Sequence, residues 1–337
     1  MNFDKGVFTI SIDFEFAWGA AHRDLSTKQL ERIRKEISIN RNLISMCETY
    51  RVPATWAIVG HLLEHDCCWQ HGVAHADFPR PITTGAQRDW FWQHPTSGDL
   101  DDELWFDRHG LIDMIRNSGV QHEIASHSYS HIMYGSADTT SAAVEWDLEK
   151  ARAIHRRNGL PFSTFVYPRN SIGHKELIRK AGLTCYRNYH RTWNGTYRGL
   201  AKRLSHAVDY YLPSSYTSLP RLEAHGLVAI DDSMLLISRN GIRRMILPTT
   251  VVRKARKGLE QAVRRQEIFH LWFHPSNFSF QTSTQFSIFE RILSLASDMR
   301  DRGDLEVSTM GEIARRWVSR REDPLVPVRA AALSRTA

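Results

Sequence analysis

The sequence predicts an α/β fold in which parallel strands alternate with helices. Two observations support this prediction: short apolar runs rich in β-branched residues recur along the chain, and longer amphipathic runs separate them. Strands that alternate with helices pair in parallel through right-handed crossovers, so an α/β barrel and an open doubly wound sheet both fit the pattern. A hydrophobic fraction of 42% in 337 residues is ample for a sizeable core.

The individual elements follow from the local patterns. The apolar runs predict strands at 7–13, 54–59, 123–126, 164–167, 183–187, 268–273 and 305–308. The amphipathic runs predict helices at 27–50, 108–117, 140–157, 174–181, 254–265, 284–302 and 311–320.

Two stretches interrupt this alternation. The first, at about 65–107, is rich in Trp, His, Asp and Pro, and the second, at about 188–253, is rich in Tyr and Arg. Connections of this length often serve as lids or binding loops. We therefore predict a single catalytic domain at 1–318 with two inserted excursions, followed by a flexible tail at 319–337.

Bulk properties indicate the compartment and the neighbours. No apolar run approaches the roughly 20 residues that span a bilayer, and the first strand-like run, VFTISID, lacks the features of a signal peptide. A cytoplasmic location is therefore expected. The four cysteines form no CxxC pair, which predicts free thiols rather than a cysteine metal site. A net charge of +7 suggests an anionic neighbour such as a membrane surface or a phosphorylated carrier. No nucleic-acid-binding motif is recognisable, so nucleic acid is not expected as a partner.

Side chains suited to catalysis follow several of the predicted strands. Active sites of parallel α/β folds form where the carboxyl ends of the strands meet, so these groups are expected to converge. They are Asp13 and Glu15 after the first strand, His127 and His131 after the third, Arg169 and Asn170 after the fourth, and His274 after the sixth.

The spacing of His127 and His131 indicates a metal site. If the pair lies on one helical turn, both imidazoles share a face. Two neutral imidazoles and one carboxylate form a common catalytic site for a divalent ion and leave positions open for water and substrate. Asp13 and Glu15 would supply this carboxylate and a second one that acts as general base.

Two further residues have more than one interpretation. His274, at the end of IFHLWFHP, could protonate a leaving amine, or it could be a structural residue beside Pro275. Arg169 could keep the acidic base ionised, bind an anionic group of the substrate, or form a surface salt bridge. His270, in the same run as His274, is expected to serve packing alone.

Five segments in order resemble the motifs of the polysaccharide-deacetylase family, also called the NodB-homology or carbohydrate-esterase-family-4 group. They are SIDFEFAWG, ATWAIVGHLL, HEIASHSYSH, FVYPRNSIGH and LWFHPSNF. The resemblance runs from about residue 7 to about residue 318. It implies a distorted (β/α) barrel, a divalent metal that is usually zinc and sometimes cobalt or nickel, and hydrolysis of an N-acetyl or O-acetyl group on a sugar.

The resemblance also implies roles for individual residues. Asp13 would be the general base and His274 the general acid, while the backbone N–H after Pro168 would stabilise the oxyanion together with the metal. The implied metal ligands are Glu15, His127 and His131. Arg169 is a further catalytic candidate, and the candidate substrate-binding residues are Trp18, Tyr167, Pro168 and Asn170.

The sequence departs from the family pattern in three places, which are the acidic motif, the proline motif and the Asp–Trp motif. Phe14 separates the two acids of the first motif and the second acid is Glu15, so the roles of base and ligand could be exchanged. In FVYPRNSIGH, Arg169 follows the proline, whereas the family arginine precedes it. The Asp–Trp motif that orients the general acid has only three candidate aspartates, Asp209, Asp231 and Asp232.

The expected substrate is a saccharide, lipid-linked, nucleotide-linked or soluble, used in surface-polysaccharide synthesis. The basic run RKARKGLEQAVRR could lie against anionic headgroups at the inner membrane face, or it could be a solvated basic helix. One alternative is an amidohydrolase of the same fold that acts on a formyl or ureido group. The other is a catalytically weak binding protein with a basic surface.

Overall fold

The computed structural model describes residues 2–67, 69–71, 73–80, 91, 101–190, 210–211 and 216–322. Its strands are β1 (Gly6–Phe14), β2 (Thr55–Ile58), β5 (Glu123–Ser126), β6 (Thr164–Val166), β7 (Cys185–Asn188), β8 (Arg221–Leu222), β9 (Val228–Asp231), β10 (Met234–Leu235), β11 (Ile268–Phe273) and β12 (Leu305–Val307). A separate antiparallel pair is formed by β3 (Trp69–Gln70) and β4 (Val73–Ala74).

The ten strands form one sheet with the order β10-β11-β1-β2-β5-β6-β7-β9-β8, and β12 pairs with the start of β1. All pairings of named strands in this sheet are parallel, apart from β8 with β9. The sheet curls, so that Ser233, just after β9, donates its backbone N–H to the carbonyl of His270 on β11 (2.9 Å). The predicted α/β fold is confirmed, and its form is the distorted barrel rather than the open sheet.

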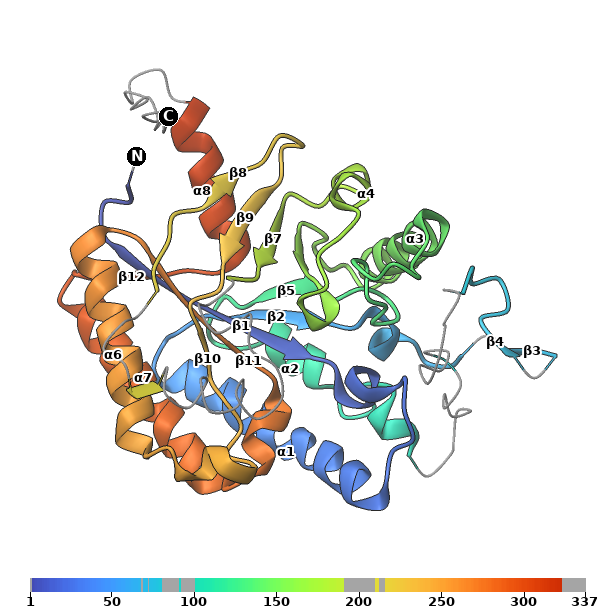
Figure 1. The fold of residues 1–337 in the computed structure, drawn as a ribbon, viewed down its shortest axis with the longest axis horizontal. Helices are drawn as coiled ribbons and strands as arrows, with labels where there is room; N and C mark the ends of the chain where they lie inside the picture. Colours follow the sequence, from blue (N-terminus) through green and yellow to red (C-terminus); the bar gives the residue numbers. More distant parts are fainter. Residues whose placement is uncertain are drawn as a thin grey trace, which may run out of the picture.

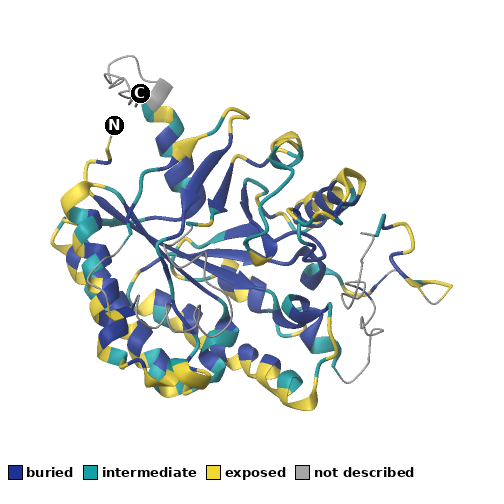
Figure 2. Ribbon diagram, viewed as in Figure 1, coloured by how far each residue is buried: buried dark blue, intermediate teal, exposed yellow. Residues whose placement is uncertain are grey.

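Helices cover the outside of the curled sheet (Figure 1). They are α1 (Thr27–Thr49), α2 (Leu111–Arg116), α3 (Ser141–Arg157), α4 (Lys175–Lys180), α6 (Pro248–Arg265) and α7 (Thr282–Asp301), whereas α8 (Met310–Glu322) packs against the inner face of the strands. Each long helix buries the face that it turns to the sheet, and the strands are buried almost throughout (Figure 2). Among the described residues, no helix has the length and apolar character required to cross a membrane.

Alternation along β1 separates two cores. Phe8, Ile10 and Ile12 pack in the large core beneath the helices, whereas Val7 packs in a smaller core with residues of α8, including Trp317. Successive side chains of a strand point to opposite faces, so those at 9, 11 and 13 share the inner face with Val7. The barrel interior is therefore apolar at the amino end, beside α8, and becomes polar towards the carboxyl end.

The second predicted excursion differs from the structure. Within 188–253, β9 pairs with β7 in parallel, β10 pairs with β11, and α6 already begins at Pro248, six residues before the predicted start at 254. The two-residue strand β10 is too short for periodicity to reveal it, and proline fits the first turn of a helix. Helix α8 continues to Glu322, and the rest of the predicted tail lies outside the described residues.

Candidate active site and metal centre

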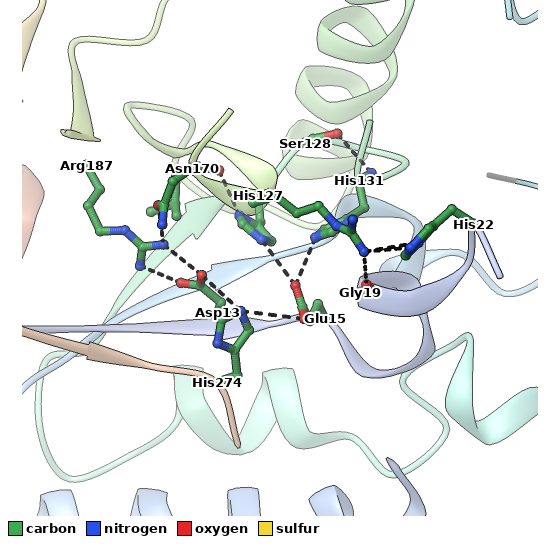
Figure 3. Close-up of polar contacts among 12 residues, drawn as sticks. Asp13, Glu15, Gly19, His22, His127, Ser128, His131, Asn170, Arg187 and His274 are labelled. Atoms are coloured by element: carbon green, nitrogen blue, oxygen red, sulfur yellow. Dashed lines mark hydrogen bonds and ion pairs between the residues drawn. The ribbon is translucent and has the colours of Figure 1, made fainter. Parts of the chain in front are cut away.

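Polar side chains from the ends of three strands, β1, β5 and β11, converge at the carboxyl ends of the sheet (Figure 3). Asp13 is the penultimate residue of β1, and Glu15 is the N-cap of the short helix η1 (Phe16–Ala20). His127 directly follows β5, and His274 directly follows β11. The sequence predicted this convergence, and the structure brings these four residues together.

Glu15, His127 and His131 form a compact cluster of possible metal ligands, with one donor atom from each within 4.8 Å of the others. Oε2 of Glu15 lies 3.4 Å from Nε2 of His127 and 2.9 Å from Nε2 of His131. His127 Nδ1 must donate to the carbonyl of Val166 (2.7 Å), because a carbonyl only accepts. This bond fixes the tautomer and leaves the Nε2 lone pair directed at the cluster, as in many metal sites.

The two histidines do not lie on a helical turn, so this part of the sequence interpretation was wrong. Residues 127–134 form a loop in which Ser128 (φ 69°) and His131 (φ 62°) adopt left-handed conformations. Asp147 of α3 holds this loop, since its carboxylate accepts hydrogen bonds from the backbone N–H groups of Tyr129 and Ser130 (both 2.9 Å). The bent loop, rather than helical periodicity, turns both imidazoles towards Glu15.

Arg187 is a functional residue that the sequence interpretation missed. Its guanidinium forms a two-pronged ion pair with Asp13, with Nη1 2.6 Å from Oδ1 and Nη2 2.7 Å from Oδ2. Both side chains are buried, with exposed fractions of 1% and 3%. The signal was present, because Arg187 is a charged residue inside an apolar strand, but no local pattern links β7 to β1.

A chain of hydrogen bonds holds Arg187 in place. Nη1 of Arg187 also donates to Ser11 Oγ (3.0 Å), and Ser11 can donate onward to His270 Nε2 (2.8 Å). His270 Nδ1 in turn donates to the carbonyl of Asp231 (3.2 Å). The guanidinium carbon lies 4.4 Å from the ring centre of Trp272. His270 therefore packs, as predicted, but it also orients the partner of Asp13.

Charge around the two acids keeps both ionised. Burial raises the pKa of Asp13, but Arg187, with smaller effects from His274 and His127, brings it below its ordinary value. Burial likewise raises the pKa of Glu15, and the neighbouring imidazoles of His274, His131 and His127 lower it well below the ordinary range. An arginine thus lowers the pKa of Asp13 and imidazoles lower the pKa of Glu15, so the two acids have different partners.

His274 lies between the two acids and is the more open of the site histidines. Its Nε2 is 3.5 Å from Asp13 Oδ2 and 3.7 Å from Glu15 Oε1, and 27% of the side chain is exposed. Neither Asp231 nor Asp232 has a described contact with it: Asp231 binds Asn188 and Tyr216, and Asp232 accepts from the backbone of His190. The third candidate partner, Asp209, lies outside the described residues.

Arg169 occupies a different place from the one expected of an arginine that ionises the base. Its Nη2 donates to the carbonyl of Gly19 (3.4 Å) and to the ring of His22 (2.8 Å), while Arg187 pairs with Asp13. Burial, followed by Arg169, lowers the pKa of His22 to about 4, so His22 is neutral and can accept this bond. The other predicted roles of Arg169, binding an anionic group of the substrate and forming a surface salt bridge, stay predictions.

The four predicted substrate-binding residues have different surroundings. Trp18 is fully buried and donates to the carbonyl of Trp105 (3.0 Å), and Tyr167 points into the large core and donates to the carbonyl of Gly173 (3.0 Å). Both rings are buried in the core, and their contact with a substrate stays a prediction. Pro168 is buried at the start of a short turn, whereas Asn170 is half-buried and accepts from Arg187 Nη2 (3.2 Å).

Two pockets flank the acids. One, of about 290 Å³, is lined by Glu15, Gly19, Glu36, Ser276 and Asn277 among others, and burial together with the charge of Glu15 raises the pKa of Glu36 well above its ordinary value. The other, of about 440 Å³, is lined by Asn170 and Trp272 and by three cationic side chains, Arg169, Arg243 and Lys254. A substrate can therefore extend from the acids in either direction.

Comparisons with solved structures show the fold. No protein-family model and no curated protein matches the sequence. A Mycobacterium smegmatis protein described as a polysaccharide deacetylase is similar over 98% of this chain and 97% of its own, with 13% identity and a TM-score of 0.62. A Pseudomonas aeruginosa PAO1 protein described in the same way has 11% identity over 95% and 92% of the two chains and a TM-score of 0.58.

A third similar structure, Puue allantoinase, has 9% identity, covers 93% of this chain and 90% of its own, and has a TM-score of 0.61. Together these likenesses define a distorted barrel of the class found in polysaccharide deacetylases. The chain therefore has the distorted-barrel fold of these solved structures, and the fold that its motifs implied is confirmed.

Proposed function

We propose that this chain is a metal-dependent hydrolase that removes an N-acetyl or O-acetyl group from a saccharide. One observation carries the proposal: a carboxylate and two imidazoles form a ligand cluster next to a buried aspartate that an arginine keeps ionised. Binding alone needs no such pairing of ligands with an ionised acid, which counts against a non-catalytic basic binding protein. The fold shared with proteins described as polysaccharide deacetylases supports the same activity.

The residues present fit a divalent ion. Glu15 would hold it with His127 and His131, and the fixed tautomer of His127 directs a lone pair at the cluster. Three protein ligands of this kind suit zinc in a catalytic site, and cobalt or nickel fit the same donors. When bound, the ion would supply Lewis-acid polarisation of the acyl carbonyl and of the attacking water.

Asp13 is the better candidate for the general base. Glu15 contacts both imidazoles of the cluster, whereas Asp13 is paired with Arg187. An ionised carboxylate held in place can take a proton from the water that attacks the acyl carbon. Arg187 therefore acts as a positioning residue that keeps Asp13 charged and oriented.

His274 is suited to return a proton to the leaving group. It is the most exposed of the site histidines, and its Nε2 lies within 3.7 Å of both acids. Its imidazolium would donate to the amine or hydroxyl as the bond to the acyl carbon breaks, giving acetate and the free sugar group. The backbone N–H of Arg169, which follows Pro168, remains the proposed donor to the oxyanion.

The experiment measures metal content and acetate release on the same samples of wild type, His127→Ala and His131→Ala, with acetylated amino-sugar oligomers as substrate. The proposal expects about one catalytic metal ion per chain, lost in both variants together with acetate release. Metal without acetate release would move the search to other amides. A wild type that takes up no zinc or cobalt at this cluster would contradict the proposal.

A second candidate function is hydrolysis of a different small amide. The fold shared with Puue allantoinase supports it, because this likeness is as extensive as that to the deacetylases. Assays with N-formyl and ureido compounds beside N-acetyl sugars distinguish the two candidates, since only the reactive acyl group differs between them.

The cationic pocket supports a substrate that carries an anionic group, such as a lipid- or nucleotide-linked saccharide. Arg169, Arg243 and Lys254 line it, and Asp232, whose pKa burial raises to about 6, is the acidic residue among its described lining. The outward face of α6 is also basic, with exposed Arg253, Arg256 and Arg264. We therefore keep a cytoplasmic location at an anionic membrane surface as part of the proposal.

A further inference from the structure

We propose that the chain has a second metal site, formed by His61, Cys67 and His75 and separate from the catalytic cluster. One donor atom from each of the three residues lies within 4.8 Å of the others, and the Nε2 atoms of His61 and His75 are 3.0 Å apart. Two imidazoles on a tetrahedral zinc ion hold their nitrogens about 3.3 Å apart, given the usual Zn–N bond lengths. The observed spacing is therefore close to that of two ligands on one ion.

The cluster is enclosed. The exposed fractions of His61, Cys67 and His75 are 0%, 8% and 3%. Aromatic rings surround the two imidazoles, with centroid distances of 4.6–5.7 Å, and they belong to Trp18, Phe91, Phe106, Tyr129 and Trp146. The surrounding rings and the burial shield the cluster from solvent, whereas a catalytic site keeps a position open to solvent and substrate.

The donor atoms of this cluster differ from those of the catalytic cluster in one ligand. A thiolate and two imidazoles are soft to intermediate ligands that favour zinc, while Glu15 gives the catalytic cluster an oxygen ligand. Binding would release the thiol proton of Cys67 and leave one net positive charge at the site. The hydroxyl of Tyr129, whose ring stands beside both imidazoles, donates to Glu64 (3.2 Å), so a carboxylate lies close to that charge.

The ion would connect the first excursion to the loop at 127–134, which carries His127 and His131. His61 lies in a short turn, η2 (Gly60–Leu63), whose backbone N–H groups at Gly60 and His61 donate to the carbonyls of Ser128 (2.9 Å) and Tyr129 (3.0 Å). Those carbonyls belong to the loop between His127 and His131. Coordination by Cys67 and His75 would therefore tie residues 67–75 to the segment that orients the catalytic imidazoles.

The sequence interpretation predicted free thiols, because no cysteines recur at regular spacing. The three ligands follow the pattern His-x5-Cys-x7-His, which is not a recognised metal-binding motif. By contrast, burial raises the pKa of Cys47 in α1 to about 12, which keeps that thiol protonated and makes it a suitable control.

Cobalt substitution tests the second site directly. A thiolate bound to cobalt(II) gives a near-ultraviolet charge-transfer band, and the catalytic cluster has no sulfur ligand, so the band reports on the second site alone. We would load the full chain with cobalt, record the spectrum, and count metal ions in wild type, Cys67→Ser, His75→Gln, His127→Ala and the controls Cys47→Ser and Cys68→Ser.

The proposal expects about two metal ions per wild-type chain and a thiolate band. Cys67→Ser should retain about one ion and lose the band, and His75→Gln should weaken both, whereas His127→Ala should retain about one ion and keep the band. No thiolate band in the cobalt-loaded wild type would overturn the proposal without any variant. A band that persists in Cys67→Ser, or that disappears in Cys47→Ser or Cys68→Ser, would overturn it as well.

Discussion

Two groups of histidines in this barrel have opposite surroundings. The mouth histidines, His127, His131 and His274, face the carboxylates of Glu15 and Asp13. The enclosed histidines, His122, His155 and His270, bond to backbone groups, and burial as the largest effect lowers their pKa values to about 4, about 4 and about 3. The two groups therefore differ in their partners, which are carboxylates at the mouth and backbone groups in the interior, rather than in burial, which lowers the pKa of His131 as well.

The largest effect on activity is expected from substitutions of the mouth histidines. His127→Ala or His131→Ala removes a ligand from the proposed metal cluster, and a Lewis-acid ion contributes several kcal/mol to such reactions, so acetate release should fall by roughly 10³-fold or more. The free energy of unfolding should change far less than activity. Metal analysis, circular dichroism and a kinetic assay on the same preparation test this, and His155→Gln serves as the matched histidine variant from the enclosed group. If His155→Gln lost as much activity as His127→Ala or His131→Ala, the mouth histidines would not differ from the enclosed ones in their effect on catalysis.

The acids sharpen the comparison, because they have different partners. Asp13→Asn should lower kcat by roughly 10²–10⁴-fold through loss of the general base while the metal content stays near that of the wild type. Glu15→Gln should lose the metal and the activity together. If Asp13→Asn released the metal and Glu15→Gln retained it, the two roles would be exchanged.

Arg187 connects catalysis to stability. Arg187→Met leaves Asp13 as an unpaired buried charge, which should reduce the free energy of unfolding by about 3–5 kcal/mol. Because Arg187 lowers the pKa of Asp13, its removal raises that pKa, and the acidic limb of the kcat/KM profile should move to higher pH.

Arg187→Lys is the control, because it keeps the charge but loses the two-pronged geometry. This variant should recover part of the stability and return the acidic limb towards that of the wild type. An unchanged pH profile in Arg187→Met would show that Arg187 is a structural residue only.

The smallest effect concerns the enclosed histidines. His155 is neutral in the folded chain, where burial lowers its pKa to about 4, whereas the unfolded chain takes up the proton near the ordinary value of 6.5. The unfolded state therefore binds more protons between these values, and stability falls as the pH drops from about 6.5 to about 4.

His155→Gln should remove up to about 1.4 kcal/mol per pH unit from that dependence. Urea unfolding at several pH values measures it. The exposed His225→Gln is the surface control, and an equal effect of both substitutions on the slope would contradict the assignment.

Local patterns predicted the parts of the site that lie on single strands. The runs at 123–126 and 268–273 correspond to β5 and β11 at both ends, so His127 and His274 were placed correctly at the carboxyl ends. The Asp13–Arg187 pair could not be predicted from local patterns, because it joins β1 to β7 across the barrel interior. The two residues meet only because the sheet curls. Trp18 packs in the core, and sequence alone does not distinguish an aromatic residue that faces a substrate from one that faces the core.

The position of β1 has a consequence for how the molecule opens. This strand pairs with β11 over Val7–Ile12 on one side, and with β12 and then β2 on the other. A strand held along both edges cannot separate locally without breaking the sheet, so its amide hydrogens should exchange only through global unfolding. The strand that carries Asp13 and leads directly to Glu15 thus belongs to the last part of the chain to lose its structure, so Asp13 keeps its place in the sheet until the chain unfolds as a whole.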